Sequence, residues 1–523
     1  RVNTDFNGPF NFMLAAFYLH TGASGDYYVG NDTLDYGQTL FGGLIAPATE
    51  AKYLSLGLTP PPYITSCTQG GGCIYGSPYY DNRGQDVTLD SRAVYGEAYW
   101  DIVPDTLKFT GGLRFTQDVK KSVGRITIFD GFEQIGNTNN DGALNQIADT
   151  GQTDFDTGNG TPPYDEFYHV RSSFNKVTGR AVLDWTPKID WTDATLVYAS
   201  YSRGYKAGGS NPGVEPGVGN GLPPTYGPET IDAYELGTKN TLLDGTLQAN
   251  ADVWYYDYKG YQISQIIANT SINANIDAKL YGVEGELKWA PDTHWAFDLN
   301  VNGMHTAVGN AALVDPRNPG ASDPTALVLK DSQLSPTNAQ NCVLYHTGVG
   351  PLATGNLDTD FATLSAITGG HIFFAPPGGI HGLAAKGVAN TAYGSCFAGT
   401  DPTNAFYGLS LQNPATLGAA LAATGWALSN PADGGTLTGV PTNVKGNRLA
   451  NTPNFSFSIG AQYTFDMDGG YTLVPRADYY YQGDMWGRIF TDGADKIKGW
   501  GVANAQLTLN APDNAWYVQA FIK

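Results

Sequence analysis

Residues 455–465 read FSFSIGAQYTF, and this stretch decides the fold class. Its apolar side chains occupy every second position, and serine, glycine, glutamine and threonine fill the positions between them. A period of two places the two sets on opposite faces of an extended chain. The stretch therefore predicts a β-strand with one apolar face and one polar face.

Strands of the same kind recur along the chain. Clear examples begin at Val94, Leu107, Leu247, Trp295 and Trp516, and their charged residues keep to the polar face. On a lipid face each charge would cost ~2–4 kcal/mol at the bilayer midplane. The pattern therefore predicts that Leu247, Val253, Phe297, Val301, Phe457 and Ile459 face lipid, and that Asp252, Glu284, Asp298 and Asn300 face a wet interior.

The connections between these strands alternate between short and long. The short ones are rich in Pro, Asp, Asn and Gly and cover 104–106, 243–245, 291–293, 466–470 and 512–514, with a longer one at 187–193. The long ones cover about 19–88, 121–172, 207–230, 259–275, 308–451 and 487–498. Such alternation is typical of an all-β transmembrane antiparallel barrel, with short periplasmic turns and long extracellular loops. Tryptophan and tyrosine near the strand ends, at Trp100, Trp185, Trp289, Trp295, Tyr463 and Trp516, fit an interfacial belt. A large soluble β-solenoid or sandwich is the alternative fold.

The composition agrees with an outer-membrane location. The formal net charge of the 523-residue chain is −20, which argues against a nucleic-acid partner. An acidic chain also suits loops that lie among lipopolysaccharide and divalent cations. The sequence has no run of 18 apolar residues of the kind that forms a transmembrane helix.

Four cysteines fall in two of the long loops. Cys67 and Cys73 enclose a glycine-rich segment of five residues, and Cys342 and Cys396 share the longest loop. An even pair in each extracellular loop predicts the disulfides Cys67–Cys73 and Cys342–Cys396. Free thiols or a zinc site with histidine partners are the alternatives.

The sequence reads as a fragment of a barrel. It begins at Arg1 without methionine or a signal peptide, and it stops at Lys523 within a strand pattern. Residues 1–4 read as the end of a descending strand and the strand after Ala515 ascends, so at least one further strand is expected after Lys523.

Several segments together resemble the barrel of TonB-dependent outer-membrane receptors. They are LDWTP at 183–187, TLVYASYSRGYKAGG at 195–209, PETIDAYELGTKN at 228–240, LKFTGGLRFT at 107–116 and NAQLTLN at 504–510. The resemblance implies a barrel of about 22 strands around a globular plug, of which roughly 14 are represented here. On that template residues 1–523 are a barrel fragment, and the plug, the first strands and the last strand lie outside it.

The resemblance also implies a function. Such receptors bind a scarce solute outside the cell and import it with energy from the TonB complex, which contacts an N-terminal region. A ferric siderophore is the expected solute, and oligosaccharides, cobalamin and plant-derived compounds are alternatives. No covalent chemistry and no cofactor are expected, and the sequence shows no G-x-S-x-G, H-E-x-x-H or phosphate-loop motif. A passive porin is the alternative function, and a barrel enzyme or adhesin is a third.

Candidate site residues fall into two groups. Aromatic residues at the outer rim, which give contact area at low entropic cost, are candidates for the solute: Tyr205, Tyr226, Tyr261 and Trp486. Charged residues on the polar face are candidates for plug contact, with mutual ion pairs or solvated charges as the alternatives: Glu97, Arg114, Arg180, Glu284 and Glu286. The 308–451 loop, between two well-patterned strands, is expected to capture the solute.

Some loop residues could bind a metal ion, but the simpler hypothesis is that they are ordinary solvated loop residues. His346, His371 and His381 lie in the 308–451 loop, and with Tyr345 and Tyr393 they could bind a metal chelate or haem. Haem receptors of the family usually carry Phe-Arg-Ala-Pro where this chain has residues 204–208, GYKAG. The stretch at 137–142, NTNNDG, is similar to a calcium loop but lacks the closing glutamate. No metal ligand is therefore assigned.

Overall fold

The computed structural model describes residues 1–29, 51, 54–55, 80–129, 168–211, 223–267, 270–320, 327–331, 341–346, 391–394, 426–428 and 439–523. Its main feature is one antiparallel sheet in which neighbouring strands follow the chain order. The strands are β1 (Val2–Asn3), β2 (Phe10–Val29), β3 (Tyr80–Val103), β4 (Leu107–Phe129), β5 (Tyr168–Trp185), β6 (Ala194–Lys206), β9 (Glu229–Leu242), β10 (Leu247–Ile267), β11 (Thr270–Trp289), β12 (Trp295–Val308), β19 (Phe455–Tyr463), β21 (Thr472–Gln482), β24 (Trp500–Asn510) and β25 (Tyr517–Ile522), with β20 (Phe465–Asp466) paired to β21.

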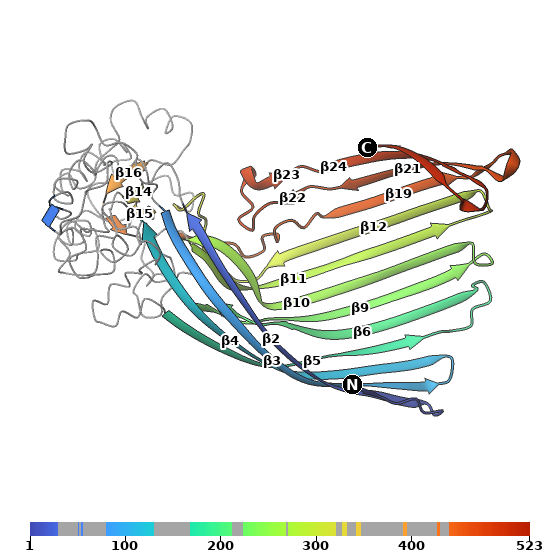
Figure 1. The fold of residues 1–523 in the computed structure, drawn as a ribbon, viewed down its shortest axis with the longest axis horizontal. Helices are drawn as coiled ribbons and strands as arrows, with labels where there is room; N and C mark the ends of the chain where they lie inside the picture. Colours follow the sequence, from blue (N-terminus) through green and yellow to red (C-terminus); the bar gives the residue numbers. More distant parts are fainter. Residues whose placement is uncertain are drawn as a thin grey trace.

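The sheet is strongly curved and open. Figure 1 shows a trough whose strands run side by side, with the tight turns at one end and the strand ends that lead to the long loops at the other. We call these the turn end and the loop end. The edge strands β1 and β25 do not pair with each other. The described residues therefore form a barrel wall that is not closed on itself. No helix among these residues is long and apolar enough to cross a membrane.

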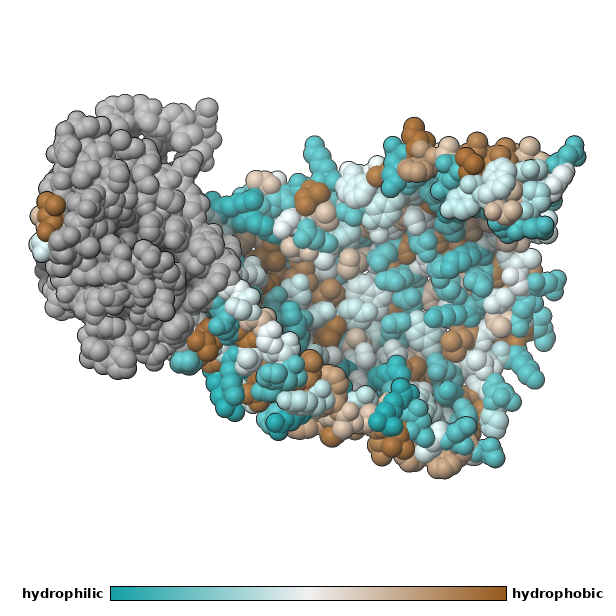
Figure 2. Space-filling view, viewed as in Figure 1, coloured by the Kyte–Doolittle hydropathy of each residue, from teal (hydrophilic) through white to brown (hydrophobic). Residues whose placement is uncertain are grey.

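The two faces of the sheet differ as the sequence predicts. Val253 lies opposite Leu236 and Val283 in the neighbouring strands, and all three side chains are exposed, by 48%, 54% and 54%. One residue earlier, Asp252 lies opposite Glu284 on the other face. Exposed aliphatic side chains in register across adjacent strands are typical of a lipid-facing surface. In Figure 2 the hollowed middle of the sheet shows mostly hydrophilic colours, and hydrophobic ones gather along its margins.

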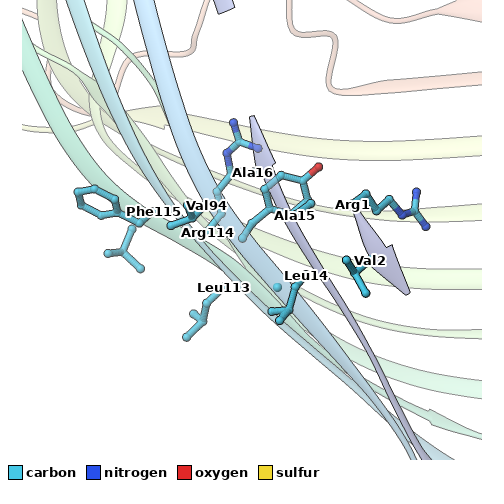
Figure 3. A pocket seen from close by; sticks show the side chains of 12 residues that line it. Arg1, Val2, Leu14, Ala15, Ala16, Val94, Leu113, Arg114 and Phe115 are labelled. Atoms are coloured by element: carbon cyan, nitrogen blue, oxygen red, sulfur yellow. The ribbon is translucent and has the colours of Figure 1, made fainter. Parts of the chain in front are cut away.

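The same sorting holds in the other strands. In β12 and β19 the pairs Leu299 with Ile459 and Val301 with Phe457 lie on the lipid-facing side, and Asn300 with Ser458 lies on the inner side. Figure 3 shows the alternation at close range in β4, where Leu113 and Phe115 lie on one side of the strand and Arg114 on the other. The predicted faces are therefore confirmed.

The turn end is built from tight turns in which the chain adopts positive φ. Asp105 has a φ of 57°, and Leu243, Asp244 and Gly245 have φ values of 56°, 56° and 81°. Exposed tryptophans mark this end of the sheet, among them Trp100, Trp185, Trp289, Trp295 and Trp516. Aromatic side chains of this kind form a belt at a membrane–water interface. The expected short turns and the expected belt are both confirmed.

At the loop end, several of the predicted boundaries between strands and loops are wrong. The strands β2, β3, β4 and β5 extend well into the segments predicted as loops at 19–88 and 121–172, and β10 and β11 pair through almost the whole of the predicted 259–275 loop. Beyond the bilayer both faces of a strand are wet, so the apolar alternation that marks a spanning strand disappears although the hydrogen-bonded ladder continues. The ladder between β10 and β11 also contains a bulge between Tyr258 and Tyr261, where Gly260 has a φ of 66°.

Short paired strands lie within the other predicted loops. They are β7 (Gly209–Ser210) with β8 (Thr225–Tyr226), β13 (Ala312–Val314) with β18 (Pro441–Asn443), β22 (Met485–Trp486) with β23 (Lys496–Ile497), and a four-stranded sheet of β14 (Leu327–Asp331), β15 (Asn341–His346), β16 (Thr391–Gly394) and β17 (Trp426–Leu428). The 308–451 segment therefore has a paired base, formed by β13 and β18.

Candidate functional site

The inner wall near β3 to β5 carries two cations that are held by their neighbours. Arg180 donates from Nε and Nη2 to the two carboxylate oxygens of Glu97, at 2.8 and 3.0 Å. Arg114 lies against the rings of Phe17 and Tyr95, at 5.3 and 5.1 Å from their centroids. A bidentate arginine–carboxylate pair has a fixed geometry. These predicted lumen residues are therefore held by contacts with other groups of the wall.

The wall formed by β6, β9, β10, β11 and β12 carries an excess of carboxylates. Asp252 lies directly opposite Glu284, and Glu235 accepts a hydrogen bond from the Tyr198 hydroxyl at 2.5 Å. Asn302 donates to Glu284 at 3.2 Å. Among the described residues, none of these three carboxylates has a cation within ion-pair distance. Like charges directly opposite each other in a sheet are unfavourable. This part of the wall is therefore suited to a cationic group from within the lumen.

Glu286 differs from its neighbour Glu284 because it is neutralised by the wall itself. Lys288 lies 2.6 Å from one of its carboxylate oxygens, and Asn250 donates to the other at 3.0 Å. Of the two glutamates predicted in this strand to face the plug, Glu284 is the one without a cation in ion-pair contact among the described residues.

Arg476 on β21 is a further inner-wall residue that the sequence patterns did not indicate. Its guanidinium donates to Asp298 at 2.8 Å and forms a short contact with Asp478 on its own strand. A β-carbon on Gly460, in the strand between them, would lie 2.4 Å from the Arg476 guanidinium and 2.6 Å from Asp298. Gly460, on the polar face of the FSFSIGAQYTF strand, is the sequence feature that could have indicated this pair, because only a glycine leaves room for it.

At the loop end, the segment after β6 folds inward as a flap. We define the flap as residues 207–211 and 223–228, which include β7 and β8. Ser210 accepts a hydrogen bond from Gln85 of β3 at 2.9 Å, so the flap reaches a strand that lies three positions from β6 in the sheet. Asn211 is fully buried, and its side chain accepts the Asn273 backbone N–H at 2.8 Å and donates to the Pro223 carbonyl at 2.9 Å. The flap is thus fastened to the barrel at both of its sides.

A second structure at the loop end is an apolar cap. Its buried members are Ile276, Ala278, Val308, Val444, Leu449 and Ile489. Tyr261 packs against this cluster and meets the ring of Tyr258 edge-on at 5.4 Å. Val444 and Leu449 belong to the base of the 308–451 segment, so that base supports the barrel.

An ion-pair cluster joins this base to the next loop. Arg488 bridges Asp315 and Asp495, with Nε 2.8 Å from an Asp495 oxygen, and Arg317 lies 3.2 Å from the same oxygen. The side chains of Asp315 and Asp495 are only 5% and 1% exposed. The raised pKa of Arg488, for which these two carboxylates outweigh the opposing effect of burial, agrees with a permanently charged bridge.

The four aromatic solute candidates do not form a single cluster. Tyr205 lies near Asp118 of β4, and Tyr226 packs over Gly209 within the flap. Tyr261 belongs to the apolar cap. The backbone carbonyl of Trp486 accepts the Asn451 N–H at 2.7 Å, so Trp486 anchors the loop of residues 485–499. Tyr205 and Tyr226, with side chains toward the inner face, remain the better candidates.

The pocket drawn in Figure 3 is a different feature. It lies at the β1 edge of the sheet and is lined by residues from both faces, such as Val2, Leu14, Val94, Leu113 and Arg114. Its position along the exposed strand edge, away from the flap and cap, separates it from the candidate solute site.

Several predicted sites lie outside the described residues. These are Cys67, Cys73, Cys396, His371, His381, the 137–142 stretch and the side chains of Cys342, Tyr345, His346 and Tyr393. The two disulfides stay predictions. Within the described ranges, no group of three or more His, Cys, Asp or Glu residues could hold a metal ion.

Comparison with known proteins gives the family to which the sequence belongs. Residues 1–326 match the family described as TonB dependent receptor-like, beta-barrel. The pesticin receptors of Yersinia pestis and Yersinia enterocolitica are each 26% identical to this chain over 236 residues, which cover 45% of this chain and 28% of the relative. The aligned part of the chain thus spans less than a third of the length of these relatives.

Solved structures of similar fold are more distant in sequence. The ferric yersiniabactin uptake receptor FyuA from Yersinia pestis has a TM-score of 0.43 and 12% identity, over 97% of this chain and 49% of that one. The siderophore receptor PiuA from Acinetobacter baumannii has a TM-score of 0.41 and 11% identity, over 84% of this chain and 46% of that one. The family match itself covers more than half of the 523 residues, and the chain belongs to the outer-membrane TonB-dependent receptor-like β-barrel family.

Proposed function

We propose that the protein imports a scarce solute across the outer membrane with energy from the TonB complex, and that the solute is a ferric siderophore. The family match over residues 1–326 carries this proposal. The pesticin receptors are relatives by sequence, and proteins described as siderophore receptors are among the solved structures of similar fold. We place solute capture at the loop end, where the flap and the apolar cap narrow the lumen.

The carboxylate-rich wall supports an energised receptor over a passive porin. Glu235, Asp252 and Glu284 face the lumen without a cation of the wall in ion-pair contact, and they lie deep in the barrel, below the flap. A plug domain with arginine or lysine at this level would neutralise them. We propose that these residues, with Glu97, Arg114, Arg180 and Glu286, form the surface that contacts the plug. The TonB complex would act on the plug side of that contact.

Catalysis is not part of the proposed function. The arginines Arg180 and Arg476 of the inner wall are already paired, with Glu97 and Asp298. Binding and release by rearrangement of the plug need no covalent step.

Solute binding can be tested on the purified receptor. Quenching of tryptophan fluorescence should be measured with ferric hydroxamate, catecholate and carboxylate siderophores and with an oligosaccharide as the competing class. Tight binding of one ferric siderophore class supports the proposal, and tight binding of the oligosaccharide alone contradicts it.

A deletion separates capture from folding. Because the base of the long segment packs into the cap, the cut should remove only residues 321–438, replaced by a short Gly-Ser linker; loop length itself costs little entropy. Barrel folding, read from heat-modifiable mobility, should persist while binding is lost. Retained binding would show that the segment does not capture the solute.

A further inference from the structure

The outward face of β2 to β5 carries cations immediately beyond the lipid-facing band. On this face Ala16, Val94, Phe115 and Val177 lie in register across the four strands, and the last three are 59%, 46% and 57% exposed. The next outward residues toward the loop end are Tyr18, Arg92, Gln117 and Asn175, also in register. The polarity of the surface therefore changes within one step along the strands.

We define the basic patch as Tyr18, His20, Arg92, Lys121 and Arg171, all of which are exposed. Lys121 and Arg171 lie directly opposite each other, one outward step (two residues) beyond the level of His20. The Arg92 guanidinium lies over the Tyr18 ring at 5.9 Å. With 3.3 Å per residue and a strand tilt near 40°, the patch spans about 5 to 15 Å above the apolar band. That depth corresponds to lipid headgroups.

The cations of the patch outnumber its acidic neighbours. Its main acidic neighbour, Asp90, is hydrogen-bonded to His20 at 2.8 Å, and this contact, aided by Lys121, lowers the pKa of Asp90. Asp86 lies further out on β3. Among the described residues, Arg92, Lys121 and Arg171 are in no ion pair. Like charges directly opposite in a sheet, as at Lys121 and Arg171, are unfavourable unless an anion lies between them.

Two other outward cations of the same sheet, Arg203 and Lys259, are in ion pairs, and a third, Lys279, lies directly opposite Asp257. Arg203 lies 3.6 Å from Asp232, and Lys259 lies 3.5 Å from Asp257 and 3.1 Å from Asp277. In a chain with a net charge of −20, unpaired cations gathered on one outward surface are therefore a local exception. They face away from the lumen, so they are not placed to bind a transported solute.

We infer that the basic patch binds the phosphates of a phosphorylated glycolipid in the outer leaflet, the lipid A part of lipopolysaccharide. Its acyl chains would lie on the apolar band at Val94, Phe115 and Val177, and its phosphates would reach Arg92, Lys121 and Arg171. Arginine and lysine side chains can extend along the strand surface to place their charges at the headgroup level. The site does not depend on which solute the protein transports.

The test measures the binding of lipid A to the purified, folded receptor in detergent by native mass spectrometry. The triple variant Arg92→Gln, Lys121→Gln, Arg171→Gln should bind lipid A on the order of a hundredfold more weakly, since each basic residue near an anionic surface contributes roughly fivefold. The matched control Arg203→Gln, Lys259→Gln, Lys279→Gln removes the same charge from the outward face of β6, β10 and β11. It should change binding less than about threefold, because Asp232, Asp257 and Asp277 already compete for those cations.

Two further arms identify the ligand. Dephosphorylated lipid A should bind the wild-type and triple variant alike, and millimolar inorganic phosphate should not displace lipid A. Equal binding of lipid A by the wild-type and triple variant, or equal losses in the triple and control variants, would overturn the proposal. Displacement by inorganic phosphate would replace it with a free-anion site. If the triple variant loses heat-modifiable folding, Lys121→Gln and Arg171→Gln alone should each show the roughly fivefold loss.

Discussion

Substituting Val253 by arginine tests the orientation of the barrel wall. Val253 is six residues beyond Leu247, which lies opposite the belt residue Trp289. At 3.3 Å per residue and a tilt near 40°, this places Val253 about 15 Å from the interface, at the middle of a core about 30 Å thick. An arginine there should cost ~2–4 kcal/mol of folding free energy, the full midplane value.

Asn302→Arg is the matched control at the same depth. Asn302 is in register with Glu284 and Asp252, one residue from the level of Val253 but on the inner face. Its arginine would meet the free Glu284 carboxylate, so folding free energy should change by less than about 1 kcal/mol. Urea-dependent unfolding in phospholipid vesicles measures both variants. A cost below about 0.5 kcal/mol for Val253→Arg with a larger cost for Asn302→Arg would refute the assignment of faces.

Three other predictions concern the loop end. Arg488→Met leaves Asp315 and Asp495 buried without their bridge and should destabilise the cluster by about 3 kcal/mol, the lower end for a broken buried pair, because Arg317 still reaches Asp495. Hydrogen exchange should quicken in residues 485–499 and stay unchanged in the turn-end strands; uniform protection would contradict the bridge. For Asp484, the hydrogen bond from Lys496 and then the Gly499 N–H lower its pKa below the ordinary 3.8, so its contribution is complete above that value and is lost as pH falls through the lowered pKa. Asp484→Asn should therefore reduce protection of the Gly499 amide at pH 7 but not at the acid end of the titration, and a pH-independent difference would reject the assignment. Peptide mapping without reduction should find the disulfides Cys67–Cys73 and Cys342–Cys396, and crossed pairs or free thiols would reject them.

The bilayer explains which parts of the fold the sequence could predict. Between the turn end and the outer interface, each strand has one face in lipid and one in water, so the period of two is visible in residues such as those at 247–255 and 455–465. The tight turns were equally visible, because positive φ at positions such as Gly245 restricts the residue types.

Beyond the interface that constraint ends. The pairing of β10 with β11 through Gln262 and Asn275 has no alternating pattern to reveal it, and it was wrongly predicted as a loop. Arg488 pairs with Asp315, which lies 173 positions earlier in the chain, and no local sequence pattern indicates such a pair. On the inner wall, charge parity predicted Glu97, Arg180 and Glu284 as lumen residues, but only the structure shows that Arg180 pairs with Glu97 while Glu284 has no described cation in ion-pair contact.

Energy coupling of uptake is the measurement that tests the proposed function most directly. Iron-starved cells that produce the protein should be given an ⁵⁵Fe-labelled siderophore of the class that the purified receptor binds, with and without a functional TonB complex and with a proton uncoupler. The proposal predicts saturable accumulation that is lost without TonB and lost with the uncoupler. Uptake that persists under both conditions and rises linearly with solute concentration would contradict it and would identify a passive channel.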